Sequence, residues 1–188
     1  MDLYTAIHER RDSEDDFAEA RPPCEVIERL IEAATWAPNH RRTEPWRFHV
    51  LAGEARAEMG QSVATWLADS GQGNETQQER TRVRLLRAPI VIALTQVGSP
   101  DNAERDLEDY AACACALQNL LLAAHAEGLA AHTSTGVMAQ YDGAKQYLGL
   151  APHDRIVAYV YLGYPPAGGV TKQAARRAAI VRWEWPEA

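Results

Sequence analysis

Three groups of residues in this chain have the types and the spacing of a ligand site. The run from Ala37 to Phe48 (APNHRRTEPWRF) places six polar residues between two prolines. Prolines hold such a loop rigid, and its polar residues offer hydrogen-bond donors. The pair Arg10 and Arg11 lies upstream, and the run from Gly128 to Gly136 (GLAAHTSTG) lies downstream. Together these groups suggest a site for a flat, anionic cofactor.

The arginine pair has two interpretations. Arg10 and Arg11 close a predicted N-terminal helix that begins at Asp2, and cations at a helix end favour the helix dipole. A guanidinium group at this position can instead grip a phosphate through two parallel hydrogen bonds. The residue types alone leave both roles open.

The other two groups are ambiguous in the same way. His40 lies in the proline-bracketed loop, where a histidine is more often a surface or capping residue than a contact to a phosphate or a ring edge. Trp36 and Trp46 flank this loop, and packing in the core or at an interface is favoured for both over stacking on a ligand. The hydroxyls of Thr133 to Thr135 lie near a predicted strand end, where open sheets bind ligands, but a plain turn has the same composition.

A further cluster of cations is predicted on one helical face and consists of Arg80, Arg84 and Arg87. Most such runs are solvated and pair with acids such as Glu79, and we favour that interpretation here. The alternative is contact with the phosphates of a nicotinamide cofactor.

Composition limits the classes of function. The chain has 188 residues and a formal net charge of −7, which fits one domain over residues 1–188. An acidic chain is unsuited to nucleic acid as its main partner, because phosphate binding needs a basic face. The first 11 residues contain no apolar segment typical of a signal peptide, and no apolar run is long enough to span a membrane. We therefore expect a cytoplasmic protein.

Other common chemistries lack their signatures. Cys113 and Cys115 are two residues apart in a helical pattern, so their side chains point to nearly opposite faces and cannot share a metal. The sequence contains no Gly-x-Ser-x-Gly, no Walker loop and no His-Glu-x-x-His. We expect no metal site and no nucleophile with its activating base.

Strand patterns alternate with helical patterns, which indicates a layered α/β-type sheet. Strands are predicted at residues 46–51, 90–97, 130–135 and 156–162, and helices at 2–11, 25–36, 54–68, 79–87, 103–128 and 141–148. Residues 69–78 are predicted to be a flexible surface segment or lid. The tail at residues 168–188 is predicted to be extended, with a helical turn as the alternative. The helix at 103–128 is apolar nearly all round, so it should pack on the sheet and on a partner subunit.

Four blocks in this order resemble the nitroreductase family of flavin enzymes, and most of all its compact bacterial subgroup of short NAD(P)H nitroreductases. They are the arginine pair after an N-terminal helix, the run from Ala37 to Phe48, the long Ala-rich helix before Gly128-Leu129, and the strand from Ile156 to Gly163 before Tyr164-Pro165. The Pro-Trp-Arg-Phe segment is the most specific of them. Together the blocks cover most of the chain.

The resemblance implies an α+β fold, an α/β/α sandwich with a mainly antiparallel central sheet and long helices that form a homodimer. It implies two FMN molecules at the dimer interface, NADH or NADPH as reductant, and reduction of nitroaromatics, quinones or related small acceptors by a ping-pong hydride mechanism. The flavin carries the chemistry, so no catalytic side chain is required. The segment from Ala123 to Gly128 would contact the nicotinamide. The residues implied to bind the cofactor are Arg10, Arg11, Asp12, Trp36, His40, Thr133, Ser134, Thr135 and Arg176, with Arg177 as an alternative to the last.

Three residues depart from the pattern that the family resemblance implies. Asp12 stands where the family usually has serine, Glu44 where glutamine commonly precedes Pro-Trp, and Trp36 where close relatives have arginine. A carboxylate at position 12 would repel a phosphate unless it turned away to pair with an arginine. Two alternatives therefore remain: a flavin-binding or scaffold protein with a degraded site and no turnover, and a related flavin enzyme that cleaves or dehalogenates its substrate.

Overall fold

The computed structural model describes residues 1–13, 17–167 and 179–182. Its centre is a four-stranded sheet in the order β1-β2-β4-β3, in which every neighbouring pair is antiparallel. The strands are β1 (Trp46–Ala52), β2 (Ile90–Gln96), β3 (Ala130–Ser134) and β4 (Arg155–Gly163). A short parallel bridge between Asp12 and Ala131 adds the N-terminal segment to the outer edge of β3.

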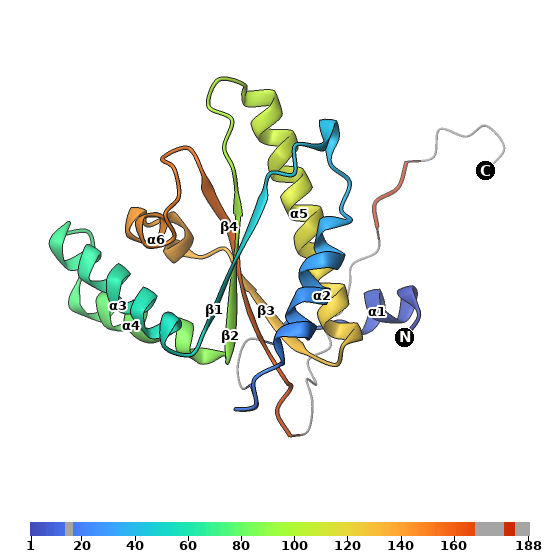
Figure 1. Cartoon of the computed structure of the whole chain (residues 1–188), viewed down its shortest axis with the longest axis horizontal. Coiled ribbons are helices and arrows are strands. Elements are labelled where there is room, and N and C mark those ends of the chain that lie inside the picture. Colours follow the sequence, from blue (N-terminus) through green and yellow to red (C-terminus); the bar gives the residue numbers. More distant parts are fainter. Residues whose placement is uncertain (14–16, 168–178, 183–188) are drawn as a thin grey trace.

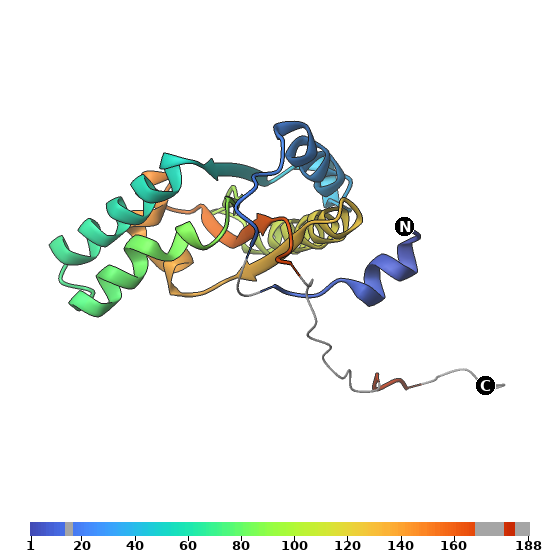
Figure 2. The same cartoon turned by 90° about the horizontal axis from the view of Figure 1, so that it is seen from below.

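Helices cover both faces of this sheet (Figures 1 and 2). One face carries α2 (Cys24–Thr35) and α5 (Ala103–Ala126), with α1 (Leu3–Glu9) against α5. The other face carries α3 (Glu54–Asp69), α4 (Glu75–Arg84) and α6 (Asp142–Tyr147). Three short 3-10 helices, η1 (His40–Arg42), η2 (Leu85–Arg87) and η3 (Val137–Gln140), join these elements. The α/β/α sandwich with an antiparallel sheet is therefore confirmed.

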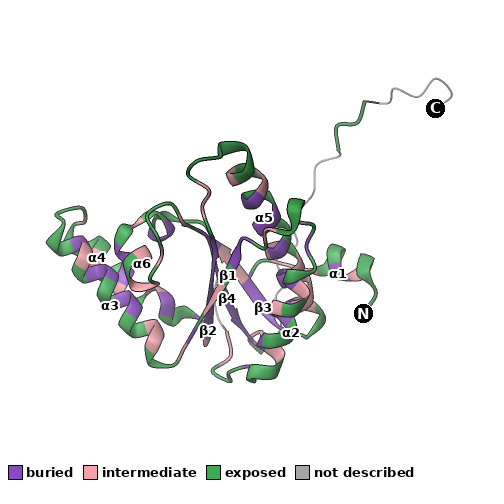
Figure 3. Cartoon of the chain, turned by 45° about the horizontal axis from the view of Figure 1, so that its top comes forward, coloured by how far each residue is buried: buried purple, intermediate pink, exposed green. Residues whose placement is uncertain are grey.

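The central strand β2 is buried on both faces, as its apolar run predicts. All seven residues of β2 are buried. Successive side chains point to opposite faces, so Ile90, Ile92 and Leu94 join the core beneath α2 and α5, while Val91 and Ala93 join the core beneath α3 and α6. Figure 3 shows these strands buried between helices whose outer faces are exposed.

Most predicted elements begin and end within two residues of the observed ones, and only the helix predicted at 79–87 differs more at both ends. Helix α4 begins at Glu75, inside the predicted loop 69–78, because Asn74 and Gln77 form a capping box at its start. It also ends at Arg84, where the 3-10 turn η2 takes over from the predicted single helix. The proposed lid is thus reduced to the short turn between α3 and α4.

Helix α5 shows only one of its two predicted contacts in this single chain. Its buried side packs on the sheet and on α2, with Cys113, Ala116 and Leu120 fully buried. On the opposite side Leu107 is 69% exposed, and Ala111 and Ala114 are exposed as well. The contact with a partner subunit stays a prediction. Within the described ranges, no helix is both long and apolar enough to cross a membrane.

Candidate functional site

The segment that carries the arginine pair is attached to strand β3. The backbone N–H of Ser13 donates to the carbonyl of Ala131 at 2.9 Å. One carboxylate oxygen of Asp12 accepts the backbone N–H of Thr133 at 3.1 Å, and the other lies 2.7 Å from His132 Nδ1. The structure therefore brings Asp12 and Ser13, which directly follow the arginine pair, beside residues 131–133 of β3. These two groups are far apart in the sequence and adjacent in the fold.

The two arginines of the pair differ in their contacts. Helix α1 ends at Glu9, earlier than predicted, and Arg10 is its non-helical C-cap. Arg11 Nη1 donates to the carbonyls of His8 at 2.6 Å and Arg10 at 3.0 Å, so Arg11 takes the helix-end role. The half-buried Arg10 side chain makes no hydrogen bond or ion pair within the described residues.

The described partners of Asp12 are residues of β3, and neither of them is an arginine. Both its oxygens are occupied by β3, through the Thr133 backbone and the His132 ring. An ionised carboxylate accepts hydrogen bonds and offers none. Asp12 thus fixes the strand to the N-terminal segment, and it keeps a negative charge close to Arg10.

A further arginine reaches the end of β3 from the other face of the sheet. Arg84 Nη2 donates to Ser134 Oγ at 3.1 Å, and the side chain is half-buried. Burial raises the pKa of Tyr161, and the Arg84 guanidinium offsets part of that increase. The prediction of a solvated arginine face is therefore wrong for Arg84, although Arg80 is exposed. The helical spacing could not show which of these arginines reached the sheet.

The hydroxyls at the end of β3 have different environments. Ser134 Oγ accepts from Arg84 and, more weakly, from the backbone N–H of Gly136 at 3.4 Å. Thr135 is exposed. Thr133 Oγ1 is buried, and no described residue forms a hydrogen bond with it. Buried hydroxyls are normally satisfied, so this atom is a candidate for a ligand contact.

The proline-bracketed loop is held by an internal network of hydrogen bonds. Asn39 Oδ1 accepts the backbone N–H of Glu44 at 2.7 Å, and Asn39 Nδ2 donates to Thr43 Oγ1 at 3.0 Å. Thr43 Oγ1 in turn donates to Asp109 on α5. Arg41 and Glu44 have positive φ values, 61° and 46°, which are rare for residues other than glycine. This network fixes an otherwise unfavourable backbone.

Within this loop His40 is exposed, as is Trp36 just before it at 81%. Trp46 is buried in the core under α2 and α5, which confirms its predicted packing role. The prediction of core packing is wrong for Trp36. Its contact with a partner subunit or with a ligand stays a prediction. His40 and Trp36 therefore lie on the surface of the single chain.

Asp109 was not among the residues that the sequence pointed to. It is 2% exposed on α5, and besides Thr43 it has Arg105 Nε 3.6 Å away. Burial raises the pKa of the Cys113 thiol to about 12, and the nearby Asp109 charge adds to the increase. Cys113 is buried and Cys115 is exposed. No group of candidate metal ligands occurs among the described residues.

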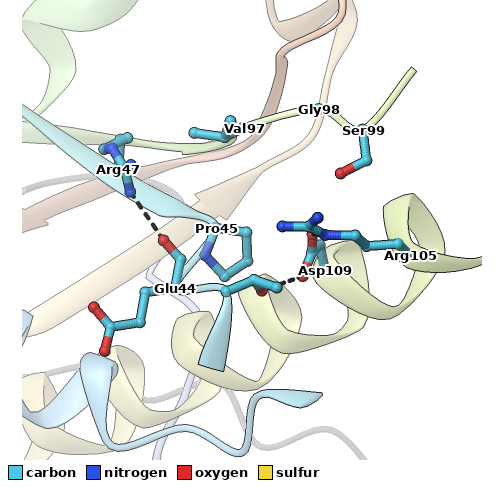
Figure 4. Close-up of a pocket in the computed structure, with 9 residues that line it drawn as sticks. Glu44, Pro45, Arg47, Val97, Gly98, Ser99, Arg105 and Asp109 are labelled. Atoms are coloured by element: carbon cyan, nitrogen blue, oxygen red, sulfur yellow. Dashed lines mark hydrogen bonds and ion pairs between the residues drawn. The ribbon is translucent and has the colours of Figure 1, made fainter. Parts of the chain in front are cut away.

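A polar pocket of about 250 Å³ lies between the proline-bracketed loop and the first turns of α5 (Figure 4). Thr43, Glu44 and Pro45 form one wall, and Arg105 and Asp109 come from the helix. The carboxylate of Glu44 points away from Arg105 and Asp109. Glu44, which stands where the resemblance implies a glutamine, therefore directs its carboxylate out of the pocket.

The two halves of the candidate site lie apart on the sheet. Thr133 pairs with Val160 of β4, whereas Trp46 on the far edge strand β1 is connected through Gln96 to Arg155. About five residues of β4 separate these two levels, which is roughly 16 Å. One chain therefore does not bring His40 and Trp36 together with Arg10 and the end of β3. Arg176 and Arg177 lie outside the described residues.

Comparisons with known proteins place this arrangement in a family. The sequence pattern of the Nitroreductase family matches residues 7–164. An Escherichia coli (strain K12) protein named "Putative NAD(P)H nitroreductase YdjA" is 27% identical over 165 residues, which cover 88% of this chain and 89% of the relative.

Solved structures agree with the family match. A nitroreductase-like family protein from Bacillus cereus superposes with a TM-score of 0.77 at 26% identity, covering 100% of this chain and 97% of the other. A nitroreductase with bound FMN from Bacteroides fragilis has the same fold, with a TM-score of 0.76 at 20% identity and coverage of 97% and 98%. The chain therefore belongs to the nitroreductase family.

Proposed function

We propose that this protein is an FMN-dependent oxidoreductase that takes electrons from NADH or NADPH and reduces small acceptors such as nitroaromatics and quinones. Family membership supports the class of reaction. The name of the Escherichia coli relative supports the nicotinamide reductant, and the FMN bound by the Bacteroides fragilis protein supports the cofactor. Three free cysteines fit a reducing compartment, in agreement with a cytoplasmic location.

The single observation that carries the proposal is the set of available donors around the end of β3. Arg10 has a guanidinium without a partner among the described residues, and Thr133 Oγ1 is buried without one. Arg84 adds a second cation, held by Ser134. A phosphate and the polar edge of a flavin need donors of these kinds, so the residues present fit FMN.

The roles of the residues follow from their chemistry. Arg10 would bind the phosphate, and Thr133 and Thr135 would donate hydrogen bonds to the ring or the ribityl chain. Arg84 would place positive charge where reduction of the ring adds negative charge. Bound flavin supplies the hydride chemistry itself, so the protein binds, orients and shields it without a side-chain nucleophile. A ping-pong order follows if reductant and acceptor use the same open face in turn.

In a dimer of two copies of the chain, one copy would supply the part of each site that contains His40 and Trp36. His40 and Trp36 are exposed on the side of β1, whereas Asp12, next to the arginine pair, contacts β3 at the other edge of the sheet. The exposed apolar residues of α5, with Leu3 and Tyr4 on α1, supply a surface for pairing two copies. A two-fold dimer would then place the His40 loop of one chain against the β3 end of the other.

The test is flavin binding and turnover by the purified protein. We expect a yellow protein that NADH or NADPH bleaches and a nitroaromatic recolours. A protein that binds FMN but is not bleached would be the non-catalytic flavin binder. A protein that stays colourless in excess FMN would overturn the proposal and favour the scaffold alternative. Turnover of halogenated but not nitro substrates would favour the dehalogenating alternative.

A further inference from the structure

Asp109 is a buried charged residue that the proposed chemistry does not use. It is 2% exposed, and Thr43 Oγ1 donates to its Oδ1. Arg105 Nε lies 3.6 Å from its Oδ2, too far for a strong hydrogen bond. Burial of a carboxylate is costly unless it is well paired. With one hydrogen bond and a loose ion pair, the burial of this carboxylate is not explained by a gain in stability.

The partner of Asp109 controls the shape of a loop. Thr43 accepts from Asn39 Nδ2 at 3.0 Å, and Asn39 also binds the backbone of Glu44 at 2.7 Å. Between them, Arg41 and Arg42 have φ values of 61° and 51°. Such strained residues persist only where surrounding contacts fix them. The bond from Thr43 to Asp109 is the contact that joins this closed network to helix α5.

We propose that Asp109 is a positioning residue that acts through Thr43 to hold the loop in the conformation that presents His40 to the cofactor. This inference rests on the proposed function, in which His40 contacts FMN. The same helix carries the exposed face proposed to pair two chains. Helix α5 therefore both joins the subunits and fixes the loop that each subunit offers to its partner's site.

The experiment is FMN titration, followed by flavin fluorescence, of the wild-type protein and four single variants. Thr43→Val keeps the shape of threonine and removes its hydroxyl, while Asp109→Ala removes the acceptor. Asp109→Asn keeps a carbonyl oxygen that can still accept from Thr43. Glu108→Gln is the matched control, since the described part of the chain contains no hydrogen bond or ion pair of Glu108.

We expect Thr43→Val and Asp109→Ala to weaken FMN binding about tenfold, the usual effect of breaking a buried hydrogen bond. Asp109→Asn should recover part of this loss, and Glu108→Gln should stay within twofold of wild type. Urea unfolding of the cofactor-free variants shows separately whether the fold is weakened. Unchanged FMN affinity in Thr43→Val and Asp109→Ala would overturn the inference and leave Asp109 with a structural role alone.

A double-mutant cycle separates positioning from a general effect on the fold. If the bond acts through His40, the double variant His40→Ala/Thr43→Val binds FMN no more weakly than His40→Ala alone. Losses that multiply would contradict the inference. If the wild type takes up no FMN, the proposed function fails and this inference falls with it. If the wild type binds and the variants match it, only this inference fails.

Discussion

Asp12 places a carboxylate beside the residues proposed to hold a phosphate. The sequence shows the carboxylate, but it could not show the partner, because His132 is 120 positions away and meets it only when β3 forms. Asp109 was missed for a similar reason. An acidic residue is usually exposed even in a largely apolar helix, and the hydrogen bond that Asp109 accepts here comes from Thr43 in a distant loop.

Replacing the charge of Asp12 should strengthen FMN binding. Asp12→Asn keeps an oxygen that can accept the Thr133 N–H and removes a negative charge near the phosphate. We expect roughly threefold to tenfold tighter binding at low salt, with a smaller gain at high salt because the site is partly exposed. Fluorescence titration at two salt concentrations measures this. Weaker binding would mean that Asp12 supports the cofactor through its link to His132.

The two roles of the arginine pair predict different outcomes for substitution. Arg10→Ala should weaken FMN binding about tenfold to a hundredfold, the usual range for a charge-assisted hydrogen bond, while the dimer persists. Arg21→Ala, which removes an exposed arginine elsewhere, serves as the control. Flavin titration with analytical ultracentrifugation measures both properties. If the Arg10→Ala variant bound as much flavin as wild type, Arg10 would have only the helix-end role.

Among the elements, buried strands were the easiest to predict. All seven residues of β2 are buried, and the first five of them form a continuous apolar run that is typical of a buried strand. The start of α4 was harder, because residues 69–78 are polar and the capping box of Asn74 and Gln77 was not recognised. Pairing between distant segments of the chain sets the order of the strands. It also sets the end of the sheet at which each loop lies. Local patterns do not contain that information.

The packing of α3 against α4 depends on the absence of a side chain at Gly60. A Cβ there would lie 2.3 Å from the backbone oxygen of Arg82. Gly60→Ala should therefore lower the free energy of unfolding by about 2 kcal/mol, despite the better helix propensity of alanine. Urea unfolding measures the change. Ser62→Ala, exposed on the same helix, is the control and should be neutral or slightly stabilising. A stabilised Gly60→Ala variant would show that the two helices separate readily.

For the whole molecule, the arrangement of α5 predicts assembly. Ala114 is exposed on the face of α5 that lies away from the sheet, and an arginine there would bury a charge in the proposed interface. Ala114→Arg should produce monomers and lose FMN, whereas Ala57→Arg, on the exposed side of α3, should remain a dimer that binds FMN. Ultracentrifugation and absorbance at the flavin band measure both. A monomeric variant that kept its FMN would confine the site to one chain.

The distance between the half-sites of one chain has a consequence for mixtures of defective proteins. If each site draws Arg10 from one chain and His40 from the other, a chain lacking only the arginine and a chain lacking only the histidine can rescue each other. Their hybrid would combine one doubly impaired site with one fully native site. Random reassortment of the two inactive parents should then restore about a quarter of all sites. The two defects would thus behave as complementing alleles.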